Sequence, residues 1–430
     1  MTGDFSSAVF EFLNNNTSYA VLRNFEGLPR NNRGRDIDIL ICKRDFELHK
    51  KSICEIISNF GYRIAILYRS DKVYAMMCVT SSGDNVHFEF LFGTSLHGVV
   101  FLMSKDVLDN RVFNGAVYHV SLEYEFLDKY LYLKSLGVEY PQKYSTVKSE
   151  VLKRNRVDSI VQGFSWFKSL SDLDSKSPRR FIWLMFLYNI RQRPIDQIKQ
   201  IALNLYYNVI NRFSLNGISF SCTGVDGVGK STIIDGIIAI LSQTSRVNLY
   251  HHRPTIIGNI GEVAYKTGLI KEVDKDFNKP HRAKKNGVIS SILRLSYYSL
   301  DYIGGYWLKC RRQMFKREVV IFDRYFSDII VDSRRSSIYL NTKFLYYWSK
   351  LFIPKMQYNF LITAQTDIIL SRKQELNSEE IEHINAKMEY LASKKGYHLI
   401  ENNGTAEQAI TKILDTIIEA QHARNMKKLE

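Results

Sequence analysis

The sequence has few cysteines, no long hydrophobic run and no internal repeat. Its five cysteines are scattered without the close spacing of a metal site, which argues against a disulfide scaffold and is typical of a reducing cytoplasm. No apolar stretch has the ~20 residues that a transmembrane helix needs, and the longest, residues 181–190, predicts a buried helix instead. The first residues lack a basic region followed by an apolar core, so we expect no signal peptide and a cytoplasmic chain.

Negative charge is scarce relative to positive charge. Lys and Arg number 59 against 44 Asp and Glu, which gives a formal net charge of +15. This balance favours anionic partners such as nucleotides, nucleic acid or an anionic membrane face, and it does not choose among them.

Length and patterning predict three regions. The 430 residues exceed one ordinary domain, and the 45% hydrophobic content is enough for sizeable cores. The secondary-structure patterns divide the chain into an α+β domain over residues 1–130, a helical connector over 131–213 and an α/β domain over 214–430.

The most specific chemical signal is GVDGVGKST at residues 224–232, which fits the phosphate-binding P-loop pattern G-x-x-x-x-G-K-[ST]. A buried-strand pattern precedes it at 217–223 and a helical pattern follows at 233–241. Glycines let successive N–H groups face a phosphate, and the helix N-terminus adds partial positive charge. The alternative is a glycine turn before a surface helix, which the correct flanks disfavour.

This motif predicts a site for ATP and Mg²⁺. Lys230 would reach the β- and γ-phosphates, and the Ser231 hydroxyl would ligate the metal. The expected nucleotide-binding residues are Gly224, Asp226, Gly227, Gly229, Lys230, Ser231 and Thr232.

Further apolar runs predict a parallel P-loop sheet with helices on both faces, because helical patterns separate them. Asp323 follows one of these runs, where an acid beside the phosphate-binding strand can hold the water shell of Mg²⁺. Arg324 next to it offers a bidentate fork for an acceptor phosphate. The runs occupy residues 247–252, 319–322, 358–363 and 397–400.

Three motifs in this order resemble the thymidylate kinase family: residues 224–232, residues 323–325 (DRY) and residues 371–375 (SRKQE). The resemblance implies that Asp226 faces the acceptor and that Arg324 bridges donor and acceptor phosphates. It also implies that Arg372 closes over the transferring phosphoryl group from a lid. The implied catalytic residues are Lys230, Asp323, Arg324 and Arg372, with ATP and Mg²⁺ as cofactors.

The chain departs from that family where an acceptor would be recognised. Arg253-Pro254 lacks the glutamate that the family places between arginine and proline, and residues 326–335 replace the family's acceptor-site residues. Thymidine monophosphate is therefore expected to be a poor acceptor.

Several charged residues are candidates for a divergent acceptor site. Asp332, Arg334 and Arg335 are either acceptor-site residues or the solvated start of a helix. Arg294 resembles the family's acceptor-site arginine more loosely. A basic insertion at 271–285 has no counterpart in the family.

The N-terminal region alternates strand and helix patterns, and one strand carries two acids. Asp36 and Asp38 lie on the same face because side chains alternate along a strand. Two adjacent carboxylates repel each other unless a cation such as Mg²⁺ lies between them, and Glu89 on a later strand adds a third acid. The predicted strands are 19–22, 36–42, 63–67, 73–79 and 86–92, with a helix over 46–60.

Asp-x-Asp on one strand with an acid on another resembles the nucleotidyltransferase superfamily over residues 15–95. The resemblance implies that Asp36, Asp38 and Glu89 bind a metal. The Gly-Ser pair with which that family grips a triphosphate is replaced by residues 22–24 (LRN). A solvated strand face, a functional metal site and a degenerate fold kept for binding are the three alternatives.

Residues 120–213 are mostly helical in pattern. Apolar residues recur at three- and four-residue spacing over 122–136 and 147–160, and a polar break follows at 171–178. Residues 179–213 are rich in aromatic and basic side chains. They predict an interdomain helix with a solvated basic face, or alternatively a peripheral membrane contact.

These patterns together predict an ATP- and Mg²⁺-dependent kinase fused to a nucleotidyltransferase-like domain. The acceptor would be a phosphate or hydroxyl group on a nucleotide, sugar or lipid-linked compound, and such fusions are similar to bacterial proteins of cell-surface polysaccharide synthesis. One alternative is a regulatory P-loop ATPase that switches a nucleic-acid or membrane partner. In another alternative, the N-terminal domain is the working enzyme and transfers nucleotides, and the kinase domain supplies its substrate. A second copy of the chain is a further candidate partner.

Overall fold

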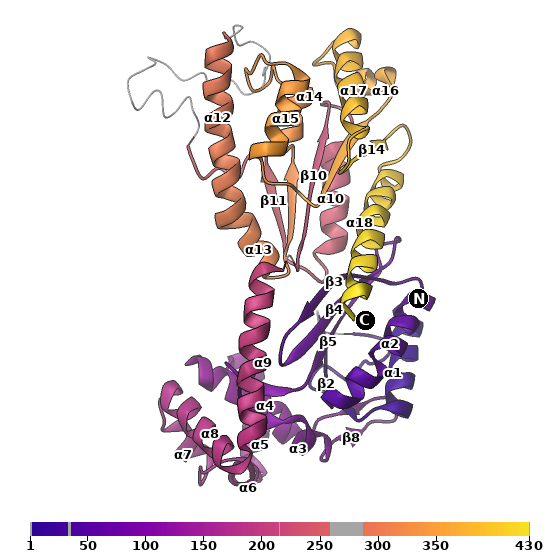
Figure 1. Cartoon of the computed structure of the whole chain (residues 1–430). Coiled ribbons are helices and arrows are strands. Elements are labelled where there is room, and N and C mark those ends of the chain that lie inside the picture. Colours follow the sequence, from indigo (N-terminus) through magenta and orange to yellow (C-terminus); the bar gives the residue numbers. More distant parts are fainter. Residues whose placement is uncertain (1, 33–35, 215, 259–286, 430) are drawn as a thin grey trace. The chain divides into compact units, whose positions relative to one another are not determined.

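The computed structural model describes residues 2–32, 36–214, 216–258 and 287–429 (Figure 1). The chain divides into two compact units, Met1–Ser214 with Ile418–Glu430, and Leu215–Ile417. Each unit has its own sheet. The basic insertion at 271–285 lies outside the described residues.

The first unit is built on a seven-stranded sheet with the order β3-β4-β5-β2-β1-β9-β8. β2 and β5 run parallel, whereas β3, β4 and β5 form an antiparallel meander. A separate hairpin follows β5. The strands are β1 (Tyr19–Val21), β2 (Ile37–Ile41), β3 (Arg63–Arg69), β4 (Val73–Val79), β5 (Asn85–Leu91), β6 (Gly93–Leu96), β7 (Val99–Met103), β8 (Val112–Phe113) and β9 (Tyr118–His119).

Both faces of this sheet are buried, and the alternation of side chains assigns neighbouring residues to different cores. Val21 and Ile39 pack in one core with α1 (Thr2–Asn16) and α2 (Lys43–Asn59). Ala20 and Leu40 pack in the other core, against the helices that follow residue 104. The short β1 and β2 are fully buried because helices cover them from both sides.

Residues 131–213, expected as a connector, belong to the first unit because their apolar faces complete its second core. The predicted polar break contains a short helix, α7, capped by the Ser169 side chain, which accepts a hydrogen bond from the Asp172 N–H. α8 buries Phe181 and Met185 in the second core. The helices are α3 (Ser104–Leu108), α4 (Leu122–Leu136), α5 (Ser145–Lys153), α6 (Val157–Phe164), α7 (Leu170–Asp174), α8 (Pro178–Gln192) and α9 (Pro194–Phe213).

The last residues of the long helix α18 (Ala406–Leu429) also belong to the first unit, although they were expected in the C-terminal domain. Asn425 Nδ2 donates to the Ile64 carbonyl at 2.9 Å, and His422 Nδ1 accepts from the Ile64 N–H at 3.1 Å. Ile64 lies on the edge strand β3, so these side chains satisfy main-chain groups that the sheet leaves open.

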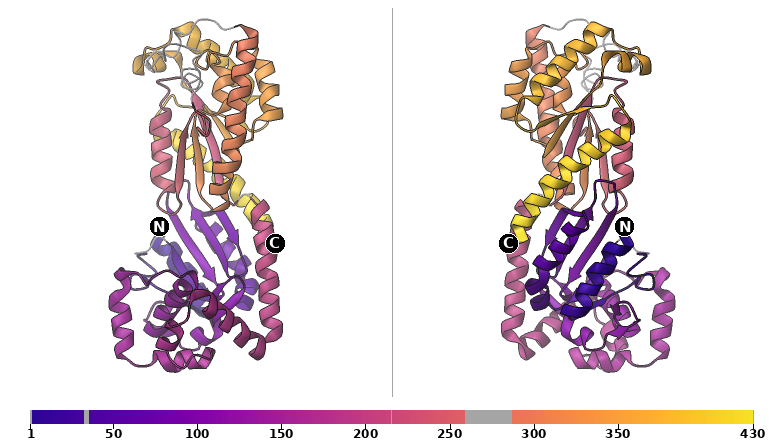
Figure 2. Two further views of the ribbon diagram at one scale, coloured as in Figure 1. Left: turned by 90° about the vertical axis from the view of Figure 1, so that its left-hand side faces the viewer. Right: turned by 90° about the vertical axis from the view of Figure 1, so that its right-hand side faces the viewer.

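The second unit has a five-stranded, wholly parallel sheet with the order β11-β12-β10-β13-β14. This confirms the predicted parallel sheet, whose central strands are buried throughout. Figures 1 and 2 show α10 (Lys230–Leu241) on one side of the sheet and α12 (Val288–Gly305) and α15 (Thr342–Phe352) on the other. The strands are β10 (Ile218–Gly224), β11 (Val247–His251), β12 (Val319–Asp323), β13 (Tyr358–Thr363) and β14 (Tyr397–Glu401).

Apart from the first part of α18, which follows β14, the helices of this unit fall between successive strands, as parallel pairing requires. They are α10 (Lys230–Leu241), α12 (Val288–Gly305), α13 (Arg311–Phe315), α14 (Phe326–Val331), α15 (Thr342–Phe352), α16 (Thr366–Arg372) and α17 (Ser378–Ala392). Across both units, none of the described helices has the length and apolar character needed to cross a membrane.

Candidate functional site

The phosphate-binding loop connects the end of β10 to the start of α10, as the motif predicts. Gly227 and Gly229 have φ angles of +88° and +94°, which side-chain-bearing residues rarely adopt. A Cβ at Gly224 would lie 2.4 Å from the Ile362 carbonyl oxygen, and one at Gly229 would lie 2.7 Å from Asn402 Nδ2. The glycines are therefore required by backbone conformation and by close packing.

Lys230 is buried at the first position of α10, with 6% of its surface exposed. Its Nζ donates to the Val225 carbonyl at 2.9 Å and lies 3.7 Å from the Asp226 carboxylate. Burial and the nearby Arg324 guanidinium lower the pKa of Lys230 to about 8, against the opposing effect of the Asp226 carboxylate. The ammonium group is thus poorly compensated and suited to a phosphate. Ser231 and Thr232 follow in the exposed first turn of α10.

Asp323 ends β12, the strand beside β10, and lies opposite Cys222 in the parallel register. Its Oδ2 lies 3.2 Å from His251 Nδ1, whereas its Oδ1 is buried with no hydrogen-bond partner among the described residues. A buried carboxylate oxygen beside a phosphate-binding loop fits the oxygen ligand or water-shell anchor that Mg²⁺ prefers.

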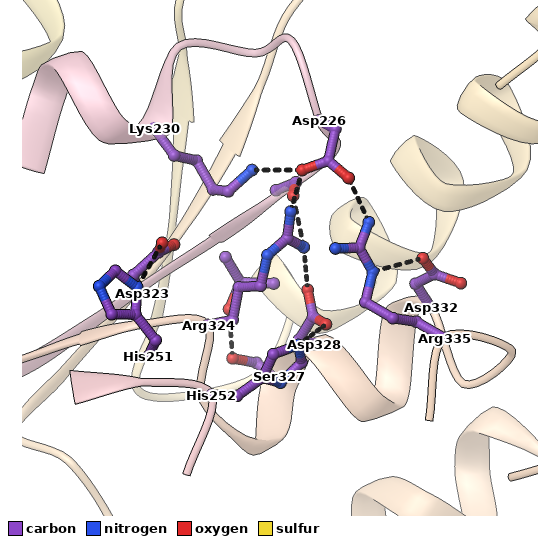
Figure 3. A network of polar contacts seen from close by, with 12 residues as sticks. Asp226, Lys230, His251, His252, Asp323, Arg324, Ser327, Asp328, Asp332 and Arg335 are labelled. Atoms are coloured by element: carbon purple, nitrogen blue, oxygen red, sulfur yellow. Dashed lines mark hydrogen bonds and ion pairs between the residues drawn. The ribbon is translucent and has the colours of Figure 1, made fainter. Parts of the chain in front are cut away.

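Arg324 projects from the turn after β12 into a network with two aspartates (Figure 3). Its guanidinium binds Asp226 of the phosphate-binding loop, and Nη1 lies 2.7 Å from Asp328 Oδ1. Its φ angle of +68° is a conformation that costs of order 1–3 kcal/mol and is concentrated at functional sites. Arg324 is only 7% exposed, so its charge is held in place rather than solvated.

Arg335 is the second arginine on Asp226, which makes this aspartate the bridge between two guanidiniums. Burial would raise the pKa of Asp226, but Arg324 and Arg335 outweigh it and hold that pKa below its usual range. Arg335 Nε also lies 3.4 Å from Asp332, whereas Arg334 points to Glu380 at 3.0 Å.

Arg335 and Asp332 therefore belong to the network, and Arg334 does not. Two members, Asp328 and His252, were missed by sequence reasoning; their carboxylate and ring nitrogen lie 3.7 Å apart. The available signal for Asp328 was its position four residues after Arg324.

Arg372 ends α16 and reaches the same loop from the segment expected to act as a lid. Its Nη1 lies 3.4 Å from the Val228 carbonyl oxygen, which also accepts a hydrogen bond from Asn402 Nδ2 at 2.7 Å. Arg294 lies on α12 and is not part of the network drawn in Figure 3.

In the first unit, two of the three predicted metal ligands lie together and the third, Asp38, has a different partner. Asp36 and Glu89 gather with His87, with one ligand atom of each within 4.8 Å of the others. Asp38 lies opposite Glu89 in the β2–β5 register, but its carboxylate binds Arg23 at 2.7 Å.

Burial raises the pKa of Asp38 to about 6, with Arg23 opposing and the neighbouring Asp36 and Glu89 adding to the rise. His87 was missed, although it shares a strand face with Glu89 two residues later.

Comparisons with known proteins found similar solved structures but no matching family. No protein-family model matches the sequence, and no curated protein matches it. The chain is similar to the thymidylate kinase of Ehrlichia chaffeensis, with 15% identity, a TM-score of 0.32, and coverage of 47% of this chain and 98% of that one. It is also similar to the thymidylate kinase of Candida albicans, with 19% identity, a TM-score of 0.33, and coverage of 48% and 93%. Both matches extend over about half of the chain.

Proposed function

We propose that the second unit is an ATP- and Mg²⁺-dependent phosphotransferase. The observation that carries the proposal is the bridge from Asp226 in the phosphate-binding loop to Arg324 and Arg335. The loop and Lys230 suit the phosphates of a donor, whereas the two guanidiniums lie beside the loop, where a second anion would share them with Asp226. A transfer enzyme needs both anion sites within reach of each other, and a nucleotide switch needs only the first.

The donor side consists of groups that the fold already holds in place. Lys230 would contact the β- and γ-phosphates, because its ammonium group is buried at the loop, where it donates to the Val225 carbonyl and lies 3.7 Å from the Asp226 carboxylate. Ser231 and Asp323 would hold Mg²⁺, and the unpartnered Asp323 Oδ1 fits that role. When bound, the metal would neutralise charge on the donor phosphates.

The acceptor side would use the two arginines on Asp226. Arg324 pairs with Asp328 and Arg335 with Asp332, so each guanidinium has a carboxylate partner besides Asp226. An acceptor phosphate would share these guanidiniums with Asp226, which orients them toward the loop. Such preorganised charge costs no rearrangement at the moment of transfer.

Arg372 would complete the site from α16. Its contact with the Val228 carbonyl places it against the loop that would hold the donor. In that position it would stabilise the transferring phosphoryl group and help to exclude water, which would otherwise intercept it.

The acceptor in this proposal is a phosphate or hydroxyl group on a nucleotide, sugar or lipid-linked compound. The test is transfer of radiolabelled phosphate from ATP to nucleoside monophosphates, sugars and lipid extracts, with Lys230→Ala as the inactive control. Labelling of one class supports the proposal. Slow ATP hydrolysis with no labelled acceptor in any class would favour a regulatory ATPase instead.

Thymidine monophosphate is predicted to be a poor acceptor in that screen. No glutamate stands between Arg253 and Pro254, and Arg253 instead pairs with Asp301 at 3.1 Å. A coupled assay that finds a kcat/KM of about 10⁴ M⁻¹s⁻¹ or more for this acceptor would contradict the prediction.

A nucleotidyltransferase activity of the first unit is the second candidate function, favoured by the convergence of Asp36, His87 and Glu89. It would act in the cytoplasm, and the fusion suits bacterial cell-surface polysaccharide synthesis. Incorporation of label from α-labelled nucleoside triphosphates by the full chain tests it. Activity that persists unchanged in Glu89→Gln would remove this site from the reaction.

A further inference from the structure

The first unit contains a cavity of about 370 Å³ that neither proposed active site uses. Its wall includes Lys43, just after β2, and Phe92, just after β5, so it lies at the carboxyl ends of these parallel strands. Asp36 precedes β2, at the opposite end. Five strand residues at ~3.3 Å each therefore separate Asp36 from the cavity end of β2 by roughly 15 Å, and Glu89 lies three residues, or roughly 10 Å, before Phe92.

The cavity wall is rich in positive charge. Among the described residues, no ion pair within 4.0 Å joins any of its four basic side chains to a carboxylate. The wall includes four basic residues, Lys43, Lys72, Arg193 and Lys199, and two acidic ones, Asp71 and Asp196.

The more buried of the two acidic residues in the wall accepts hydrogen bonds from side-chain amide groups. Asp71 is 4% exposed, and its carboxylate accepts hydrogen bonds from Gln200 Nε2 at 3.2 Å and Asn204 Nδ2 at 3.1 Å. Asp196 is exposed in the first turn of α9. The wall therefore keeps an excess of two positive charges.

Three of the basic side chains contact aromatic rings or neutral groups instead of carboxylates. Lys43 Nζ lies 5.5 Å from the centre of the Phe92 ring, and Lys72 Nζ lies 4.9 Å from that of Tyr132. Arg193 donates to Asn189 Oδ1 at 2.9 Å. Burial lowers the pKa of Lys43, Glu47 and Asp71 oppose that effect, and Lys199 lowers the pKa further, so burial and the second cation together disfavour the charged form.

We propose that this cavity binds a small phosphorylated compound, with its phosphate held by Lys43, Arg193 and Lys199. A phosphate dianion matches the excess of two positive charges, and the arginine fork suits its oxygens. The volume falls in the range of small-molecule sites, and Phe92 and Leu203 offer apolar surface for an organic group. The site stands independently of the proposed phosphotransferase.

The test measures binding of inorganic phosphate and of glucose 6-phosphate by calorimetry in chloride buffer. The full chain carries Lys230→Ala, which weakens the phosphate-binding loop. One equivalent is expected to bind in the cavity, and Lys43→Gln/Lys199→Gln should weaken the binding of that equivalent at least tenfold. The control Lys51→Gln/Lys153→Gln removes two exposed charges of the same unit away from the cavity and should leave affinity unchanged.

A second measurement separates a binding role from a structural one. Without phosphate, Lys43→Gln/Lys199→Gln should melt at the same temperature as its parent or higher, because it removes uncompensated charge. A lower melting temperature would make the cations structural and overturn the proposal. Unchanged phosphate affinity in this variant, or no saturable binding in its parent, would overturn it as well. Lys199→Glu, at an exposed position, provides a further variant that should also lose binding.

Discussion

Each of the two units contains a largely buried aspartate, and the pKa values of these two aspartates shift in opposite directions. Asp226 in the second unit bridges two arginines, and its pKa falls below the usual range. Asp38 in the first unit has one arginine and two acidic neighbours, and burial raises its pKa to about 6. Burial disfavours both carboxylates, so the balance of neighbouring charges decides the sign. Asp226 is therefore a permanent anion that positions cations, whereas Asp38 is a weaker acid held beside a candidate metal cluster.

Removal of Lys230 should have the largest effect. Lys230→Ala is expected to lower phosphoryl transfer by at least ~100-fold, because a charged donor aimed at the transferring group is worth several kcal/mol in an enclosed site. Turnover on the identified acceptor measures it, with the exposed Lys412→Ala as the matched control. Wild-type turnover in Lys230→Ala would remove this residue from the mechanism.

Substitution of Arg324 should separate the acceptor side from the donor side. Arg324→Ala is expected to lower transfer by ~100-fold, with ATP affinity from calorimetry changed by less than ~3-fold. Arg324→Ala also leaves Asp226 and Asp328 with one cation fewer. Arg324→Lys is therefore a milder variant, which keeps the positive charge and loses the bidentate guanidinium.

The same comparison distinguishes the two neighbouring arginines. Arg335→Ala should resemble Arg324→Ala, whereas Arg334→Ala should be close to wild type, since Arg334 pairs with Glu380 outside the network. Parallel losses of transfer and ATP affinity would argue against an acceptor clamp.

The pH dependence of ATP affinity should report Lys230. Its pKa in the free chain is about 8, and contact with phosphate would raise it, so binding is coupled to proton uptake above pH 8. Affinity should be level below pH 8 and fall up to tenfold per pH unit above it. Lys230→Arg, whose guanidinium stays charged, should remove this fall; a pH profile unchanged in that variant would assign the titration to another group.

The metal cluster of the first unit should give the smallest effect. Mn²⁺ is expected to raise its melting temperature by a few degrees through mass action. In the full chain, Asp36→Asn/Glu89→Gln should lose this shift in melting temperature. Asp323→Asn, which lies in the other unit, should still show the Mn²⁺-dependent shift of the first unit. Persistence of the whole shift in Asp36→Asn/Glu89→Gln would leave a solvated strand face as the better interpretation.

Local sequence determined several elements of each unit. The strand predicted at 73–79 is β4, that at 358–363 is β13, and the helix at 122–136 is α4, because apolar periodicity reports which face a local segment buries. The phosphate-binding loop was equally readable, since its glycines are required by φ angles and close approaches inside one short segment. Asp323 beside it was predictable because parallel strands end at one edge of the sheet.

Only the tertiary structure decided which charges meet. Asp226 and Arg335 are more than a hundred residues apart, and nothing local distinguishes Arg335, which joins the network, from Arg334, which does not. The same holds for Asp38, which forms an ion pair with Arg23. His87, not Asp38, lies close to Asp36 and Glu89. Side-chain charges act over a few ångströms of space, whatever their separation along the chain. Sequence patterns therefore predicted the elements and their motifs, and folding determined the partners of each ionised group.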